Sequence, residues 1–111
     1  MNRLRLCLGT MITAAVLLLW AGAMAEIRIN EVMASNGVYQ DGHAYDWAEL
    51  YNDGAEVSLA GWYLSNDPYQ PYKWAFPSGA KIAENGYLIV YCAGEGKEPM
   101  TDALCTNFKL S

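Results

Sequence analysis

The chain has 111 residues, with 12 acidic and seven basic side chains and a formal net charge of −5 at pH 7. This length supports one small domain around one hydrophobic core. The acidic balance and the scattered bases disfavour nucleic acid as a partner, because such a surface repels a phosphate backbone.

The first 25 residues are predicted to be a helical secretory signal peptide that precedes the folded domain. Basic residues come first, an uncharged apolar run follows, and small residues end it: Arg3, Arg5, residues 6–20, Ala23 and Ala25. Cleavage is expected between Ala25 and Glu26, and it leaves five bases against 12 acids, a net charge of −7. The alternative is an uncleaved membrane anchor, because residues 6–25 are long enough to span a bilayer. Either way, the domain at 26–111 is predicted to be secreted or displayed at the cell surface.

Residues 26–111 predict an all-β sandwich. Short runs rich in Ile, Val, Leu, Tyr and Trp alternate with turn residues, and no helical pattern appears. Strands are expected at 27–33, 46–52, 57–65 with a bend at Gly61, 73–77, 87–94 and 104–111. The run at 87–94 is apolar on both faces, which favours a central strand.

The strand count predicts an incomplete sheet. Six strands are visible, whereas an immunoglobulin-like sandwich has about seven or more, so the last strands are predicted to be missing. We expect this to leave the 87–91 region or its neighbour with an unpaired apolar edge that is prone to aggregation.

The stretch "DWAELYN" at 46–52 carries two acidic residues that could form a catalytic or metal-binding pair. Strand parity places Asp46 with Ala48 and Leu50 on one face, and Glu49 with two aromatic residues on the other. The two carboxylates therefore cannot jointly hold a metal or a glycosidic bond. Asp46 is predicted to cap backbone N–H groups and Glu49 to accept hydrogen bonds from a neighbouring strand. No enzyme activity and no cofactor are predicted.

The cysteines and the single histidine suggest no metal site. Cys92 and Cys105 are either a disulfide, which in an oxidising compartment could add about 3 kcal/mol, or two buried thiols, and the sequence leaves both open. His43 lies in a glycine-flanked loop, is expected to be exposed to solvent, and has no ligand partner at metal-type spacing.

Several motifs together resemble the lamin-tail domain of exported bacterial proteins. They are "INEVMASN", "DWAELYN", "LAGWYLSND", "YKWAFPSGAKIAENGYLIVY" and "TNFKLS", in the order and at the spacing of that family over residues 27–111. The resemblance implies an immunoglobulin-like β-sandwich without an active site, with about two further strands after Ser111. It also implies structural roles at Asn30, Glu31, Asp46, Trp47, Glu49 and Trp62. DNA contacts known for nuclear lamin tails do not carry over, since the basic residues are missing.

Aromatic residues suggest where a partner binds. Trp62 and Trp74 share strand faces with Leu64 and Phe76 and are predicted to pack in the core, which leaves Tyr63, Tyr69 and Tyr72 as a candidate binding set. The predicted function is a non-catalytic extracellular or cell-surface module for attachment or interaction with a protein. The alternatives are a carbohydrate-binding module for cell-surface polysaccharide, and a docking domain for a CotH-like kinase or hydrolase encoded beyond Ser111.

Overall fold

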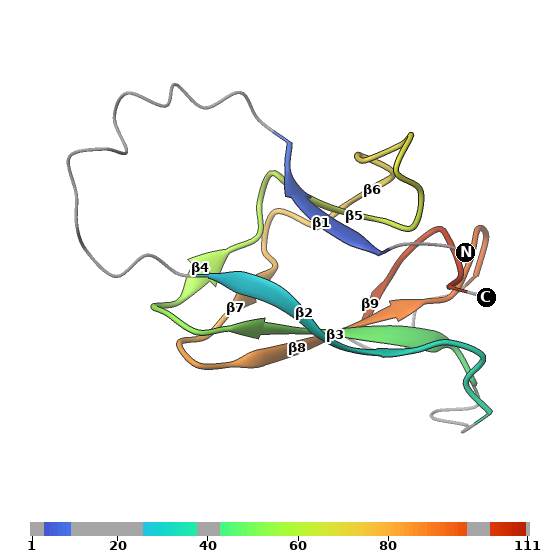
Figure 1. Ribbon diagram of the computed structural model, residues 1–111, viewed down its shortest axis with the longest axis horizontal. Helices are drawn as coiled ribbons and strands as arrows, with labels where there is room; N and C mark the ends of the chain where they lie inside the picture. Colours follow the sequence, from blue (N-terminus) through green and yellow to red (C-terminus); the bar gives the residue numbers. More distant parts are fainter. Residues whose placement is uncertain (1–3, 10–25, 38–42, 98–102, 111) are drawn as a thin grey trace.

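The computed structural model describes residues 4–9, 26–37, 43–97 and 103–110, and these residues form nine β-strands joined by turns and loops. Two sheets face each other as layers, with a small two-stranded sheet at one end (Figure 1). Within the described ranges, no helix is long and apolar enough to cross a membrane. The predicted all-β sandwich is confirmed.

The larger sheet has the strand order β2-β3-β8-β9. Strand β2 (Ile27–Met33) pairs antiparallel with β3 (Asp46–Asn52), and β3 pairs antiparallel with β8 (Tyr87–Cys92). Strand β9 (Leu104–Cys105) then runs parallel to β8 on its other side. The central position predicted for β8 is confirmed. The unpaired edge was predicted at 87–91 or its neighbour. In the described residues β9 covers β8 at Val90 and Tyr91, and the two-residue β9 is itself the outermost strand on that side.

The facing sheet has the order β1-β5-β6. Strand β5 (Trp62–Ser65) lies between β1 (Arg5–Leu8) and β6 (Trp74–Ala75), and both neighbours are antiparallel to it. The small sheet joins β4 (Val57–Ser58) to β7 (Lys81–Ile82). Gly61, with a φ of 83°, makes the predicted bend that separates β4 from β5.

Strand β1 corrects one expectation. Residues 5–8 were predicted to belong to a helical leader, and the structure has them as a strand on β5. The short run "RLCL" alternates well enough for a sheet, and without it β5 would present unpaired backbone groups along one side. Tertiary pairing therefore overrides the helical expectation for these four residues.

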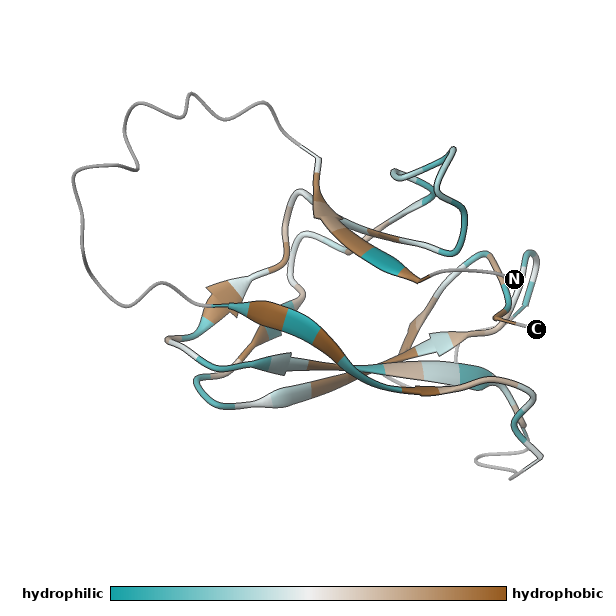
Figure 2. Cartoon of the chain, in the orientation of Figure 1, coloured by the Kyte–Doolittle hydropathy of each residue, from teal (hydrophilic) through white to brown (hydrophobic). Residues whose placement is uncertain are grey.

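The core lies between the two sheets and follows strand parity. Ala48 and Leu50 of β3 are fully buried, as predicted, and so is Leu64 of β5. Trp62 and Trp74 pack against this cluster from its margin and stay half-buried. Apolar residues alternate with polar ones along β2, whereas the loop between β5 and β6 is hydrophilic (Figure 2).

One buried polar residue, Asn52, ties three segments together at the end of β3. Its side-chain amide nitrogen lies 2.8 Å from the carbonyl oxygen of Ala55, 3.1 Å from that of Ala83 and 3.3 Å from that of Ile82. Its Oδ1 accepts a hydrogen bond from the Gly54 N–H at 3.1 Å. No residue of this kind was singled out from the sequence.

Candidate functional site

The loop of residues 66–73 between β5 and β6, here called the tyrosine loop, carries two exposed aromatic residues, and one of them, Tyr69, is the most exposed large hydrophobic residue of the described chain. Ser65, fully buried at the end of β5, organises its first turn. The Ser65 hydroxyl donates to the Gln70 carbonyl at 2.6 Å and accepts from the Asp67 N–H at 3.0 Å. The Asp67 carboxylate then accepts the Tyr69 N–H at 2.9 Å. The turn is therefore pre-shaped by its own hydrogen bonds.

A second set of contacts fixes the tyrosine loop to the carboxyl-terminal segment. The Asn66 side chain donates to the Lys109 carbonyl at 2.9 Å and accepts from Lys73 Nζ at 3.0 Å. Asn107 donates to the Lys73 carbonyl at 3.2 Å, and the Lys73 ammonium lies 5.6 Å from the centre of the Phe108 ring. Both ends of the loop are thus held in place.

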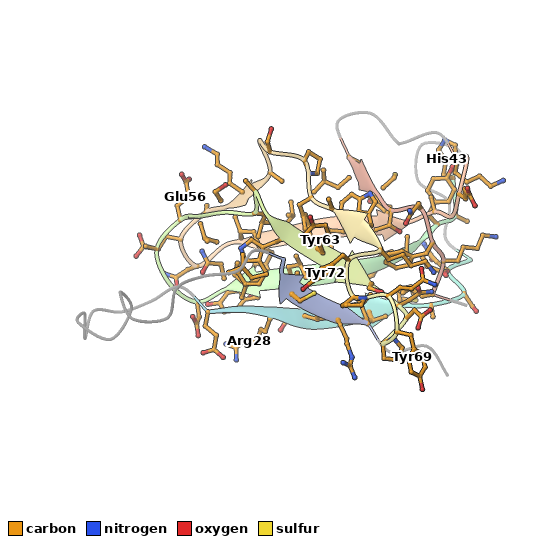
Figure 3. The ribbon with its side chains drawn as sticks, turned by 90° about the horizontal axis from the view of Figure 1, so that it is seen from above. Arg28, His43, Glu56, Tyr63, Tyr69 and Tyr72 are labelled. Carbon is orange, nitrogen blue, oxygen red and sulfur yellow. The ribbon has the colours of Figure 1, made fainter. Side chains whose placement is uncertain are left out.

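The three predicted tyrosines divide into two groups. Tyr63 and Tyr72 have ring centres 5.0 Å apart and tilt against each other, whereas Tyr69 extends away from the molecule (Figure 3). Tyr69 is 91% exposed and Tyr72 is 58% exposed. Tyr63 is half-buried and supports Tyr72 from behind. Of the three tyrosines predicted from the sequence, the structure therefore has Tyr69 and Tyr72 on an accessible surface.

An open hollow of about 530 Å³ lies beside these rings. It is lined by Tyr69, Gln70, Pro71, Tyr72, Lys73, Glu95 and Asn107. Glu95 and Asn107 lie far from the tyrosine loop in sequence, so sequence reasoning missed them, and no local pattern marks either one. The hollow combines aromatic faces with amide, carboxylate and ammonium groups.

The acids of the 46–52 stretch lie on opposite faces of β3. Asp46 is buried, and its two carboxylate oxygens accept the backbone N–H groups of Asn36 at 3.2 Å and Leu110 at 3.0 Å. Glu49 accepts a hydrogen bond from the Asn30 side chain at 2.9 Å. Asn30 lies at a bulge where the β2–β3 register shifts. These carboxylates hold strands and chain segments together.

Glu31 and Trp47 of the predicted structural motif lie on the same sheet, whereas Trp62 lies on β5 of the facing sheet. Glu31 is exposed and lies opposite Glu49 in the β2–β3 register. Trp47 is half-buried on the outer face and lies between Met33 of β2 and Tyr91 of β8. None of these residues borders the hollow.

A second aromatic group covers the outer face of the larger sheet. Tyr87 is 61% exposed, and its ring centre lies 4.8 Å from that of Tyr51. The Arg28 guanidinium lies 5.3 Å from the centre of the Tyr51 ring. This face provides an exposed tyrosine that lies outside the tyrosine loop.

Cys92 and Cys105 are free thiols in the structure, and Cys92 is buried whereas Cys105 is half-buried. Cys105 pairs with Tyr91, the neighbour of Cys92, and adjacent strand positions point to opposite faces. Burial raises the pKa of the Cys92 thiol to about 12, and the Thr106 hydrogen bond only partly offsets this.

His43 and the acidic residues form no metal centre in the part of the chain that the structure describes. There, no group of three His, Cys, Asp or Glu side chains could hold a metal ion. His43 is half-buried rather than exposed, because its ring stacks on Tyr45 with centres 4.7 Å apart.

Two facing layers, antiparallel except for the β8–β9 pair, define an immunoglobulin-like β-sandwich. Residues 21–109 match the family model of the Lamin Tail Domain, and the chain belongs to that family. The family is one of non-catalytic immunoglobulin-like domains that generally serve protein interaction. Comparison with curated proteins gives no match, and comparison with solved structures gives none either.

Proposed function

We propose that residues 26–111 act outside the cell or on its surface as a non-catalytic module that binds a protein partner through the tyrosine loop. The observation that carries this proposal is the exposure of Tyr69 and Tyr72 on a loop held by its own hydrogen bonds. Tyrosine supplies a large amphipathic contact area, and a pre-shaped loop loses little conformational entropy on binding. Such rings are enriched at the centres of protein interfaces.

Export is supported by the surroundings of Glu26. Its backbone nitrogen donates to Asp53 Oδ1 at 3.1 Å, and the Asp53 N–H donates back to the Glu26 carbonyl. Cleavage after Ala25 would turn that amide into an ammonium group next to the same carboxylate. Arg28, 3.7 Å from Asp53, shares this carboxylate. The new amino-terminal ammonium group at Glu26 would therefore form an ion pair with Asp53 at the start of β2.

Cell-surface polysaccharide is the second candidate partner. The observation that favours it is the hollow itself, where the tyrosine rings lie beside Gln70, Glu95 and Asn107. Aromatic faces with a few converging polar groups are suited to orienting a small polar ligand. The long open side of a sugar chain could lie along such a surface.

The export part of the proposal is tested on the full chain in a secreting host. Amino-terminal sequencing of the secreted protein should find Glu26 first. Retention of Met1 or Leu6 would overturn the cleavage step and favour the anchor.

The binding part is tested with two probes, a displayed random-peptide library and a panel of cell-wall polysaccharides. We expect peptide clones whose binding is lost in Tyr69→Ala and retained in the control Tyr87→Ala, which removes an exposed tyrosine from the larger sheet. Binding to polysaccharide alone with the same loss in Tyr69→Ala would assign the second candidate. Binding that Tyr69→Ala and Tyr72→Ala leave unchanged would refute a role for the tyrosine loop.

A further inference from the structure

We infer that the side of β5 occupied by β1 is an acceptor for an extended strand of a partner protein, one with alternating apolar residues and a basic residue between them. This inference rests on the proposed function in one respect, namely that residues 1–25 leave the mature chain. Removal of those residues takes β1 with them, and β5 then becomes the outermost strand of its sheet. The side of β5 that β1 occupies is called the β5 edge below.

The backbone of the β5 edge is arranged for antiparallel pairing. Residues 5–8 lie opposite residues 65–62 in unbroken register, and the Gly9 N–H extends the ladder by donating to the Gly61 carbonyl at 2.9 Å. The Trp62 carbonyl instead accepts from Phe76 on the β6 side. Because hydrogen-bonding directions alternate along an antiparallel strand, Tyr63 and Ser65 turn their backbone groups toward β1. Those groups lose their partners when the leader is removed.

The side chains of β1 show which strand this edge accepts. Leu6 lies opposite the buried Leu64, and Leu4 and Leu6 both pack against the core. The side chain of Cys7 points to the other face, where its thiol donates to the Pro71 carbonyl at 3.2 Å. At Gly9 an added Cβ would overlap the Tyr63 ring. A strand that binds this edge should therefore have apolar residues at the positions of Leu4 and Leu6, a small residue at Cys7 and a glycine at Gly9.

Charge and location narrow the partner further. The mature chain has a net charge of −7, with five bases against 12 acids, and the segment that occupies the edge carries Arg5. An acidic domain attracts a basic strand during encounter. The edge also adjoins the tyrosine loop, since Cys7 reaches Pro71 in that loop. A partner strand on β5 would extend the surface proposed above, in the manner of β-strand addition.

The test uses the full chain and a fluorescent peptide with the sequence of residues 4–9. Leu6→Asp places a charge on the core-facing side of β1 and should release it from β5. We expect saturable anisotropy changes with this variant and at least tenfold weaker binding to the unaltered chain. The chain's own strand competes there at an effective concentration on the order of millimolar. A peptide with Asp in place of both core-facing leucines should not bind.

A second variant guards against misfolding. Gly9→Val places a side chain against the Tyr63 ring, which should weaken the pairing of β1 with β5, and leaves the core-facing leucines unchanged. If either variant melts cooperatively and the peptide fails to bind, the inference is wrong. If both variants aggregate, the peptide should restore a monomer and the Asp-substituted peptide should not, and equal behaviour of the two peptides would also overturn it. A strand-exchanged dimer that excludes the peptide would assign the edge to a second copy and refute the partner strand.

The outcome is separable from that of the proposed function. Tyr69→Ala should leave peptide binding to the β5 edge unchanged, because the Tyr69 side chain points away from the molecule. Failure of the peptide experiment therefore leaves export and the tyrosine loop standing. Failure of export leaves the acceptor geometry of β5 standing, with residues 4–9 as its permanent occupant.

Discussion

Asn52 offers the sharpest test of how this small sandwich is held together. Its two amide hydrogens face the carbonyls of Ala55, Ala83 and Ile82, and its oxygen accepts from Gly54. The residue is fully buried, and the contacts join the end of β3 to the loop before β4 and to the turn after β7. Replacement by alanine removes every one of these hydrogen bonds and opens a small cavity.

The expected loss in Asn52→Ala is about 3 kcal/mol. The two amide hydrogens and the accepting oxygen make about three hydrogen bonds in all, because the three carbonyls share two hydrogens, and each contributes about 1 kcal/mol net. For a domain of this size, 1 kcal/mol corresponds to about 4–8 °C in Tm, so a drop of roughly 12–24 °C is expected. Glu84→Ala, an exposed change in the neighbouring turn, is the matched control and should stay within about 0.5 kcal/mol.

Asn52→Asp separates hydrogen bonding from shape, because it keeps the size of the side chain and replaces the donor by a carboxylate. At pH 7 this carboxylate would face three carbonyl oxygens in a buried site, so the variant should be less stable than Asn52→Ala. The same surroundings raise the folded-state pKa of the new carboxyl above its ordinary value of about 3.9. Its protonated form can donate one hydrogen bond and is the form that the folded state prefers.

The sign of the pH dependence follows from linkage. A carboxyl whose folded pKa is raised favours folding below its unfolded pKa, and this stabilisation is lost as pH rises through the folded value. The Tm deficit of Asn52→Asp should therefore shrink between pH 7 and pH 4, whereas that of Asn52→Ala should stay nearly constant relative to the unaltered chain. Thermal unfolding followed by circular dichroism measures both. An aspartate variant as stable as the unaltered chain at pH 7, or a deficit that pH does not change, would refute the role assigned to the amide.

Three further predictions concern other residues. Asp46→Asn should lower stability by about 1–3 kcal/mol, because one of its two backbone donors loses an acceptor, and Glu49→Gln should cost less than about 1 kcal/mol because the Asn30 contact is exposed. Thermal melts test this, and a turnover that disappears in either variant would overturn the non-catalytic assignment. Ser65→Ala should weaken binding through the tyrosine loop while the strands persist, seen as faster amide exchange confined to 66–72. Cys92 should resist thiol reagents at pH 8 until the chain unfolds. Its pKa is raised from 9.0 to about 12, so this thiol favours folding below pH 9 and the contribution is lost as the pH rises toward 12.

Local periodicity was sufficient for the parts of the fold that depend on neighbours in sequence. The bounds of β2 and β3, the buried face of β3 and the bend at Gly61 all follow from parity and turn chemistry. The opposite faces of Asp46 and Glu49 follow in the same way. Each of these features is fixed within a few residues of the chain.

Features set by long-range pairing could not be predicted. Strand β7 has only two residues and lies between turn residues, so no alternation marks it. The parallel return of β9 to β8 depends on where a long connection ends, and the hollow depends on Glu95 and Asn107 approaching the tyrosine loop from other parts of the chain. Two of the three carbonyl partners of Asn52, those of Ile82 and Ala83, lie 30 and 31 residues further along the chain. The sequence context of Asn52 resembles an ordinary Asn-Asp-Gly turn.

The sequence reasoning placed a vulnerable edge at 87–91 or its neighbour, because that run is apolar on both faces. Strand β3 covers one side of β8, and β9 covers the other side at Val90 and Tyr91 and is itself the outermost strand. If residues 1–25 are removed as proposed, β5 loses its neighbour on one side. Its β6 side is fixed by residues eight or more positions further along the chain, whereas its other side is covered only by residues 5–8. The sequence "WYLS" does not show whether β5 keeps both neighbouring strands or loses β1. That depends on whether a segment more than fifty residues earlier in the chain is removed.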